Sequence, residues 1–97
     1  MDKRTQRIIQ NYFKSKPVEK AWLFGSFARG EETPTSDIDI LVSLTPLSGL
    51  GLQFFGMVID LEKLLKRPVD LVVDGNLLPF ARESANKDKI LVYERAN

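Results

Sequence analysis

Hydrophobic side chains recur at helical spacing in two long segments of the chain. Residues 5–15 repeat apolar positions at helical intervals, which predicts an amphipathic helix. Apolar positions between residues 52 and 65 do the same and predict a second helix that ends near Arg67 and Pro68. These apolar positions are Ile8, Ile9, Tyr12 and Phe13 in the first segment and Leu52, Phe55, Ile59, Leu61, Leu64 and Leu65 in the second. Gly56 costs the second helix up to about 1 kcal/mol relative to Ala, which favours either close packing against a sheet or a later helix start.

Shorter apolar runs separate these segments and predict β-strands. The strands are expected at residues 21–24, 37–43 and 69–73, with residues 90–93 as a candidate fourth. The connections are expected to be a helical turn at 26–30, a polar loop at 31–36, a loop at 46–51, a turn at 74–76 and a helix from Pro79 to about Ala85. Strands separated by helices predict an α/β (α+β) fold, with a small mixed β-sheet of three to four strands flanked by helices, in a single domain over residues 1–97.

The residue types present narrow the possible chemistry. The chain has no Cys and no His, which excludes disulfides, Ser–His–Asp and Cys–His nucleophilic catalysis, and the usual zinc sites. A net charge of +1 and scattered Lys and Arg residues give no reason to expect direct nucleic-acid binding. No apolar stretch approaches the roughly 20 residues of a membrane span, and no secretory signal opens the sequence. We therefore expect no membrane contact and a cytoplasmic location.

Three aspartates interrupt the predicted strands. Asp37 and Asp39 stand one residue apart, so alternation along a strand points both to one side, while Ile38 and Ile40 point to the other. Two carboxylates held so close repel one another unless a cation lies between them. Asp70 reaches the same cluster if its strand lies beside the first. Oxygen ligands without His or Cys select a hard cation such as Mg²⁺, which shares its site with substrate phosphates.

Each aspartate also has an ordinary structural explanation. Asp37 could cap a turn or helix after Ser36, Asp39 could lie on a solvated edge strand, and Asp70 could be a turn residue after proline. For any one of them alone the structural explanation is favoured. Their joint occurrence is better explained by one shared metal site.

A glycine–serine pair precedes the first two aspartates. Gly25 and Ser26 are expected to form a tight turn whose backbone N–H groups and serine hydroxyl can bind phosphate. Gly25 and Gly30 have the spacing of a Walker P-loop, but two glutamates occupy the positions of its Lys and Ser/Thr, which excludes that motif. The structural alternatives are an N-cap without a ligand for Ser26 and a solvated surface charge for Arg29.

One known family combines these motifs. The sequence resembles the minimal nucleotidyltransferase (MNT) domains of the DNA polymerase β-like nucleotidyltransferase superfamily over about residues 21–73. The resemblance depends on three segments, which are Gly25-Ser26-Phe27-Ala28-Arg29-Gly30, Ser36-Asp37-Ile38-Asp39-Ile40-Leu41-Val42 and Val69-Asp70-Leu71-Val72. It implies the polymerase β-like nucleotidyltransferase fold, and the chain also has the length of a minimal domain.

The resemblance implies a role for each motif residue. Asp37 and Asp39 would bridge two Mg²⁺ ions, and Asp70 would bind one of them and help to deprotonate the attacking hydroxyl. Two metal ions about 3.5–4 Å apart can stabilise both the attacking and the leaving oxygen of a displacement. The Gly25 turn and its serine would hold the triphosphate of ATP. Arg29 would either order the loop or contact phosphate, with the structural role favoured.

The same resemblance implies a reaction and a partner. MNT domains are commonly encoded beside a HEPN-domain partner in toxin–antitoxin modules, so we expect an antitoxin that transfers AMP from ATP to a tyrosine hydroxyl of the toxin. Two alternatives stay open, namely a non-catalytic antitoxin that acts by binding and the catalytic subunit of a small-molecule nucleotidyltransferase.

The small size of the chain also bears on partners. A thin core makes a protein partner or a homo-oligomer physically reasonable. The candidate contacts are Leu50, Leu52, Phe54 and Phe55, although apolar residues at this spacing more often face the core.

Overall fold

The sheet and its helices follow the predicted order along the chain. The computed structural model describes residues 3–45, 51–74 and 86–96. The elements are α1 (Lys3–Phe13), β1 (Val18–Phe24), α2 (Gly25–Arg29), β2 (Ile38–Leu44), α3 (Leu52–Leu65), β3 (Val69–Val73) and β4 (Ile90–Glu94). The helix expected at residues 79–85, most of the loop at 46–51 and most of the turn at 74–76 lie outside the described residues.

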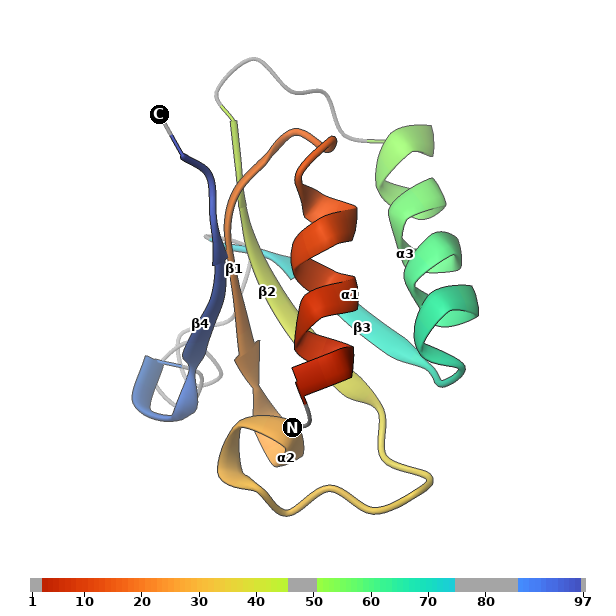
Figure 1. The fold of residues 1–97 in the computed structure, drawn as a ribbon, viewed down its shortest axis with the longest axis vertical. Helices are drawn as coiled ribbons and strands as arrows, with labels where there is room; N and C mark the ends of the chain where they lie inside the picture. Colours follow the sequence, from red (N-terminus) through yellow and green to blue (C-terminus); the bar gives the residue numbers. More distant parts are fainter. Residues whose placement is uncertain (1–2, 46–50, 75–85, 97) are drawn as a thin grey trace.

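Four strands form one mixed sheet in the order β3-β2-β1-β4 (Figure 1). β1 pairs with β2 and with β4 in antiparallel orientation, whereas β2 pairs with β3 in parallel. The predicted small mixed sheet flanked by helices is therefore confirmed, and the candidate fourth strand is present.

The core lies between one face of this sheet and the helices α1 and α3, which cover that face (Figure 1). The buried side chains that meet there include Ile9 and Phe13 of α1, Met57 and Leu61 of α3, and Ile38, Ile40 and Val42 of β2. Burying a side chain of this size contributes about 1.5–3 kcal/mol relative to leaving it exposed. None of the described helices has the length and apolar content needed to cross a membrane.

The first strand begins earlier than its apolar pattern indicates. β1 starts at Val18 rather than at residue 21 because the chain on either side of it extends the hydrogen bonding. The Arg95 N–H donates to the Glu19 carbonyl at 2.7 Å, and Lys20 forms a cross-strand ion pair with Glu94 at 3.5 Å. Glu19 and Lys20 at this end of the strand are exposed and charged, so the apolar alternation does not extend to the start of β1.

The position of Gly56 contradicts both predicted explanations for it. α3 begins at Leu52, so Gly56 lies inside the helix rather than before it. The position that its Cβ would occupy has no described atom within 4 Å, the backbone of the helix aside, so it does not pack against the sheet. The predicted partner contacts differ in exposure. Phe54 packs against the core, whereas Leu52 and Phe55 are 91% and 68% exposed. Leu50 lies outside the described residues.

Candidate active site

One row of residues crosses three strands at the end of the sheet where α2 begins. β1 and β2 pair Phe24 with Asp39, and β2 and β3 pair Asp39 with Asp70. Register partners on neighbouring strands stand about 4.8 Å apart in the hydrogen-bonding direction and project to the same face. The sheet therefore brings two of the three predicted aspartates side by side.

Asp37 lies just before this row. β2 begins at Ile38, one residue later than expected, where the Ile38 N–H donates to the Pro68 carbonyl at 3.0 Å. That bond fixes the start of β2 against the start of β3. Because β2 is an interior strand of the sheet, the edge-strand explanation for Asp39 is wrong.

Electrostatic crowding marks Asp39, whose carboxyl group is half-buried. Burial raises the pKa of Asp39, and the charges of Asp70 and Asp37 raise it further, while Arg29 acts in the opposite direction. The charged carboxylate is therefore disfavoured in the folded protein. A bound cation would reverse this situation, because an opposite charge at close range favours the ionised form.

The donor set fits a hard divalent cation. Among the residues that the structure describes, no three acidic side chains are already arranged closely enough to hold a metal ion. Mg²⁺ keeps several of its waters and takes further oxygens from substrate phosphates, so it does not need an all-protein cage. The aspartates supply only oxygen, and a cation bound beside them would offset the burial and the neighbouring carboxylates that raise the pKa of Asp39. These residues therefore fit Mg²⁺ that arrives with a nucleotide.

Gly25 places the glycine–serine turn directly against Asp39. Its φ of 72° is left-handed, a conformation that favours glycine, and a Cβ on Gly25 would overlap the Oδ2 atom of Asp39. Both facts favour glycine at this position, since a methyl group would be strained and would displace the Asp39 carboxylate. Ser26 follows within the first turn of α2, whose N-cap residue is Phe24, so the explanation of Ser26 as an N-cap is wrong.

Arg29 is engaged in ion pairs at the C-terminal end of α2. Its Nε atom lies 2.5 Å from Glu31 Oε1, and its Nη1 atom lies 3.1 Å from Asp88 Oδ2. Hydrogen bonds to these two carboxylates raise the pKa of Arg29. The guanidinium therefore ties α2 to the following loop and to the segment before β4, which is more than a solvated surface charge. Its contact with phosphate stays a prediction.

Arg67 is a positioning residue that sequence analysis missed. Its Nη1 atom donates to the carbonyls of Ser36 at 3.0 Å and Thr33 at 3.4 Å, and its guanidinium lies 4.9 Å from the ring centre of Phe27. Arg67 thus links the turn before β3 to the loop before Asp37 and to the helix that carries the glycine–serine turn. Its neighbours in the sequence carry no signal for these contacts, which exist only in the folded chain.

Comparisons with known proteins match most of the length of the chain. The family described as the nucleotidyltransferase domain matches residues 6–93. A relative from Methanocaldococcus jannaschii, named "Putative protein adenylyltransferase MJ0128", is 36% identical over 91 residues, which cover 93% of this chain and 89% of that protein.

Solved structures share the fold. A crystal structure of a toxin–antitoxin with AMP-PNP has a TM-score of 0.74 and 20% identity, covering 96% of this chain and 74% of that chain. A structure of a tri-AMPylated HEPN toxin from Shewanella oneidensis in complex with an MNT antitoxin has a TM-score of 0.71 and 18% identity, covering 97% of this chain and 73% of that chain.

Proposed function

The chain belongs to the nucleotidyltransferase domain family of enzymes, and on that premise we propose that it is an antitoxin that transfers AMP from ATP to a tyrosine hydroxyl of a HEPN-domain toxin. The observation that carries the proposal is the pairing of Asp39 with Asp70 directly beside Gly25. The relative named as a protein adenylyltransferase and the complex of an AMPylated toxin with an MNT antitoxin support the choice of reaction and partner.

The three aspartates have a shared task in this proposal. Asp37, Asp39 and Asp70 would hold two Mg²⁺ ions, which neutralise charge on the triphosphate and on the reacting oxygens. Burial, and then the charges of Asp70 and Asp37, raise the pKa of Asp39, so the charged carboxylate is disfavoured in the folded protein. Repulsion between the three carboxylates does not stabilise the fold, so their clustering supports a role in ligand binding.

The reaction is a displacement at the α-phosphorus of ATP. The tyrosine oxygen forms a bond to this phosphorus while the bond from the phosphorus to the oxygen that bridges to the β-phosphate breaks, and pyrophosphate leaves. Asp70 accepts the hydroxyl proton and passes it to water. Asp70 suits this role because it is exposed on the edge strand β3, where a protein acceptor can reach it. Because the chain has no His, a carboxylate is a suitable general base to accept this proton.

The glycine–serine turn binds the triphosphate. Gly25 has no side chain, so a phosphate can approach the backbone close to Asp39. The hydroxyl of Ser26, one residue further on, donates a hydrogen bond to a phosphate oxygen. Arg67 keeps the loop before Asp37 in place through the Ser36 carbonyl.

Intact mass spectrometry of the toxin tests this proposal. The toxin is incubated with ATP, Mg²⁺ and the chain, and its mass should rise by one or more AMP units that map to tyrosine. Asp39→Asn should abolish the addition, whereas Asp74→Asn should retain it, because Asp74 is an exposed residue four positions beyond Asp70. A toxin that is inhibited without any added mass would contradict transfer and favour neutralisation by binding.

A further inference from the structure

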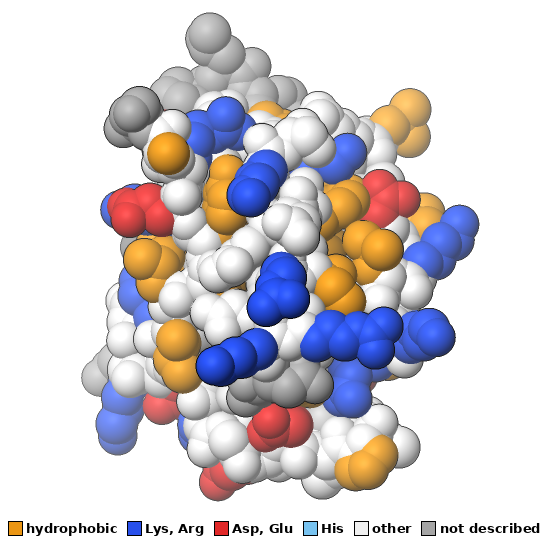
Figure 2. Space-filling view, viewed as in Figure 1, with side chains coloured by type: hydrophobic (Ala, Val, Ile, Leu, Met, Phe, Trp, Pro, Cys, Tyr) orange, Lys and Arg blue, Asp and Glu red, His pale blue; other side chains and the backbone are white. Residues whose placement is uncertain are grey.

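The outer face of α3 is apolar where a surface helix is normally polar. Leu52, Phe55 and Ile59 follow one another at intervals of three and four residues and are 91%, 68% and 51% exposed. They lie opposite Met57 and Leu61, which face the core. Figure 2 shows hydrophobic side chains at the surface on the side of the molecule where α3 lies, next to charged side chains. Exposed apolar residues that form a contiguous stripe are typical of interaction surfaces.

Gly56 lies in the same stripe, and no contact within the described part of the chain explains a glycine at this position. Glycine destabilises a helix interior relative to Ala. Its φ is not in the left-handed region, and a Cβ would meet no described atom beyond the helix backbone. Neither conformation nor packing of the described chain therefore requires glycine here. An approaching partner would supply the missing reason.

The spacing of these residues identifies the shape of the partner. Positions i, i+3, i+4 and i+7 of a helix surround the hole that receives one side chain of a facing helix. Leu52, Phe55, Gly56 and Ile59 occupy these four positions. With glycine at one corner the hole is wide, so a second helix can approach closely.

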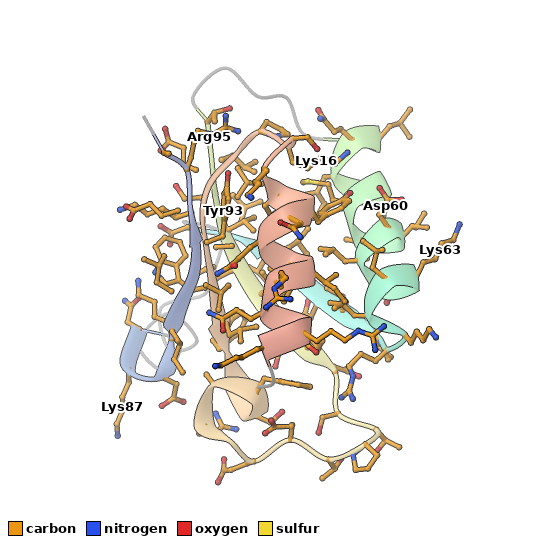
Figure 3. All side chains as sticks on the ribbon, viewed as in Figure 1. Lys16, Asp60, Lys63, Lys87, Tyr93 and Arg95 are labelled. Carbon is orange, nitrogen blue, oxygen red and sulfur yellow. The ribbon has the colours of Figure 1, made fainter. Side chains whose placement is uncertain are left out.

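The charge along the same face indicates the chemistry of the partner. The face continues to Lys63, and Lys66 follows directly after the helix as its left-handed C-cap residue. Both lysines are exposed, and Figure 3 shows Lys63 pointing away from the body of the molecule. The acidic residues that flank it are engaged within the chain. Asp60 accepts a hydrogen bond from the Tyr12 hydroxyl at 2.7 Å, and Glu62 accepts one from the Val69 N–H at 3.0 Å. The face therefore presents apolar groups followed by positive charge.

We propose that this outer face, defined by Leu52, Phe55, Gly56, Ile59 and Lys63 of α3 together with the C-cap residue Lys66, docks a helix of the partner toxin whose apolar stripe ends in Asp or Glu side chains. The identity of the partner depends on the proposed function, whereas the shape and charge of the docked helix do not. Aliphatic side chains in the centre of the face favour a protein over RNA, since they gain nothing from phosphates.

A second copy of the chain fits this face less well. Two α3 helices packed in parallel would set Lys63 and Lys66 against the same lysines of the other copy, which is repulsive. Packed antiparallel, they would set the lysines toward the apolar end of the other helix. None of the six residues that define the face is acidic, so neither arrangement satisfies the charge.

Calorimetric titration of the toxin into the purified chain tests the proposal. Gly56→Leu fills the hole and should weaken binding at least tenfold, while the melting temperature of the isolated chain stays the same or rises. Asn11→Leu is the matched control, because it adds an exposed leucine to the outer side of α1 and should leave the affinity unchanged. Lys63→Glu should weaken binding several-fold, with a larger effect at low salt.

Each outcome bears on a different claim. Unchanged affinity of Gly56→Leu for the toxin would overturn the docking surface while leaving AMP transfer intact. If Gly56→Leu instead disrupts self-association in sedimentation runs and toxin binding is unaffected, the face belongs to a second copy and the proposal is wrong. Toxin that binds through this face but gains no AMP would overturn the proposed function and keep the docking surface. Absence of binding to the unsubstituted chain would overturn both.

Discussion

Two neighbouring rows on one face of the sheet differ in what they do, although the same three strands build both. The first row is Phe24, Asp39 and Asp70, and the second, two residues further along β2, is Trp22, Leu41 and Val72. Leu41 of the second row is only 1% exposed, whereas the pKa of Asp39 in the first row is raised. The Lys89 ammonium lies 4.6 Å from the ring centre of Trp22 and helps to cover the second row.

The difference shows where this small protein gives up stability for chemistry. The second row stabilises the sheet by packing, as a row in a two-sided sheet is expected to do. The first row places like charges together, which no requirement of the fold explains. Local conflicts of this kind are expected at functional sites. Substitutions in the first row should therefore lower activity, whereas substitutions in the second row should lower stability.

The largest expected effect comes from neutralising the first row. Asp39→Asn should reduce AMP transfer by at least about 10³-fold, because it removes a ligand of the reaction's cations. Its melting temperature should not fall, since burial and the neighbouring Asp70 already disfavour the charged carboxylate. Initial rates by mass spectrometry and a thermal melt measure the two quantities. A variant that loses its fold would show that Asp39 is structural and would erase the contrast between the rows.

The second row should respond in the opposite way. Leu41 is only 1% exposed, so Leu41→Ala should leave a buried cavity and lower the free energy of unfolding by about 3 kcal/mol. Transfer activity per folded molecule should persist at a temperature below the lowered transition. Urea unfolding followed by circular dichroism, together with rates at low temperature, checks both points. Loss of activity in a fully folded Leu41→Ala sample would mean that the rows are coupled.

The turn beside the first row should be sensitive to a single methyl group. Gly25→Ala should cost about 2 kcal/mol of stability and lower the transfer rate, because the methyl group is strained at positive φ and overlaps Asp39. Gly30→Ala is the control, since Gly30 has nearly the same φ but no atom of the described residues, its chain neighbours aside, lies within 4 Å of its Cβ position. If Gly30→Ala reduces the rate as much as Gly25→Ala, the close approach to Asp39 has no catalytic importance.

Arg67 tests whether the first row depends on support from outside the strands. Arg67→Ala removes the bonds to Ser36 and Thr33 and should lower kcat/KM about tenfold, equivalent to about 1.4 kcal/mol. Arg67→Lys keeps the charge but not the planar donor group, so it should restore only part of the rate. Steady-state kinetics of the three proteins give the comparison. Equal rates would show that the loop before Asp37 is ordered without this side chain.

The hydrogen bond from Tyr12 to Asp60 lies away from both rows and serves as a reference for the effect of losing one ordinary polar contact. Burial, and then the hydrogen bond to Asp60, raises the pKa of Tyr12 well above its usual range. The fold therefore favours the neutral phenol, so stability is present below about pH 10 and falls as pH rises beyond that value. Tyr12→Phe should cost about 1 kcal/mol at neutral pH, flatten this alkaline decline and leave AMP transfer unchanged. Unfolding free energies measured across pH 8 to 11 would reveal any other behaviour.

Local patterns were sufficient to predict much of the fold. Alternation predicted the strands around Ile40 and Leu71, and helical spacing predicted α1, because these elements bury one apolar face. Helical spacing also predicted α3, although most of the apolar positions in that pattern are exposed, namely Leu52, Phe55, Ile59 and Leu64. The charged residues at 19 and 20 concealed the start of β1, since a strand end that faces water has no apolar alternation.

The candidate site shows the same limit. Asp39 and Asp70 could be selected from the sequence because carboxylates are unusual inside apolar strands. Their side-by-side register could not, since it depends on which strands become neighbours. The contacts of Arg67 and the open surroundings of Gly56 are properties of the folded chain alone. Sequence patterns therefore indicated the kind of site, and tertiary structure supplied its supports.

Calorimetry of nucleotide binding tests whether the aspartates of the first row bind a nucleotide through Mg²⁺. A non-hydrolysable ATP analogue is titrated into the chain in Mg²⁺ or in EDTA, and into Asp39→Asn and Leu41→Val under the same conditions. Binding should require both Mg²⁺ and Asp39 and should survive Leu41→Val. Equal affinity in EDTA, or equal affinity for Asp39→Asn and the unsubstituted chain, would contradict this prediction.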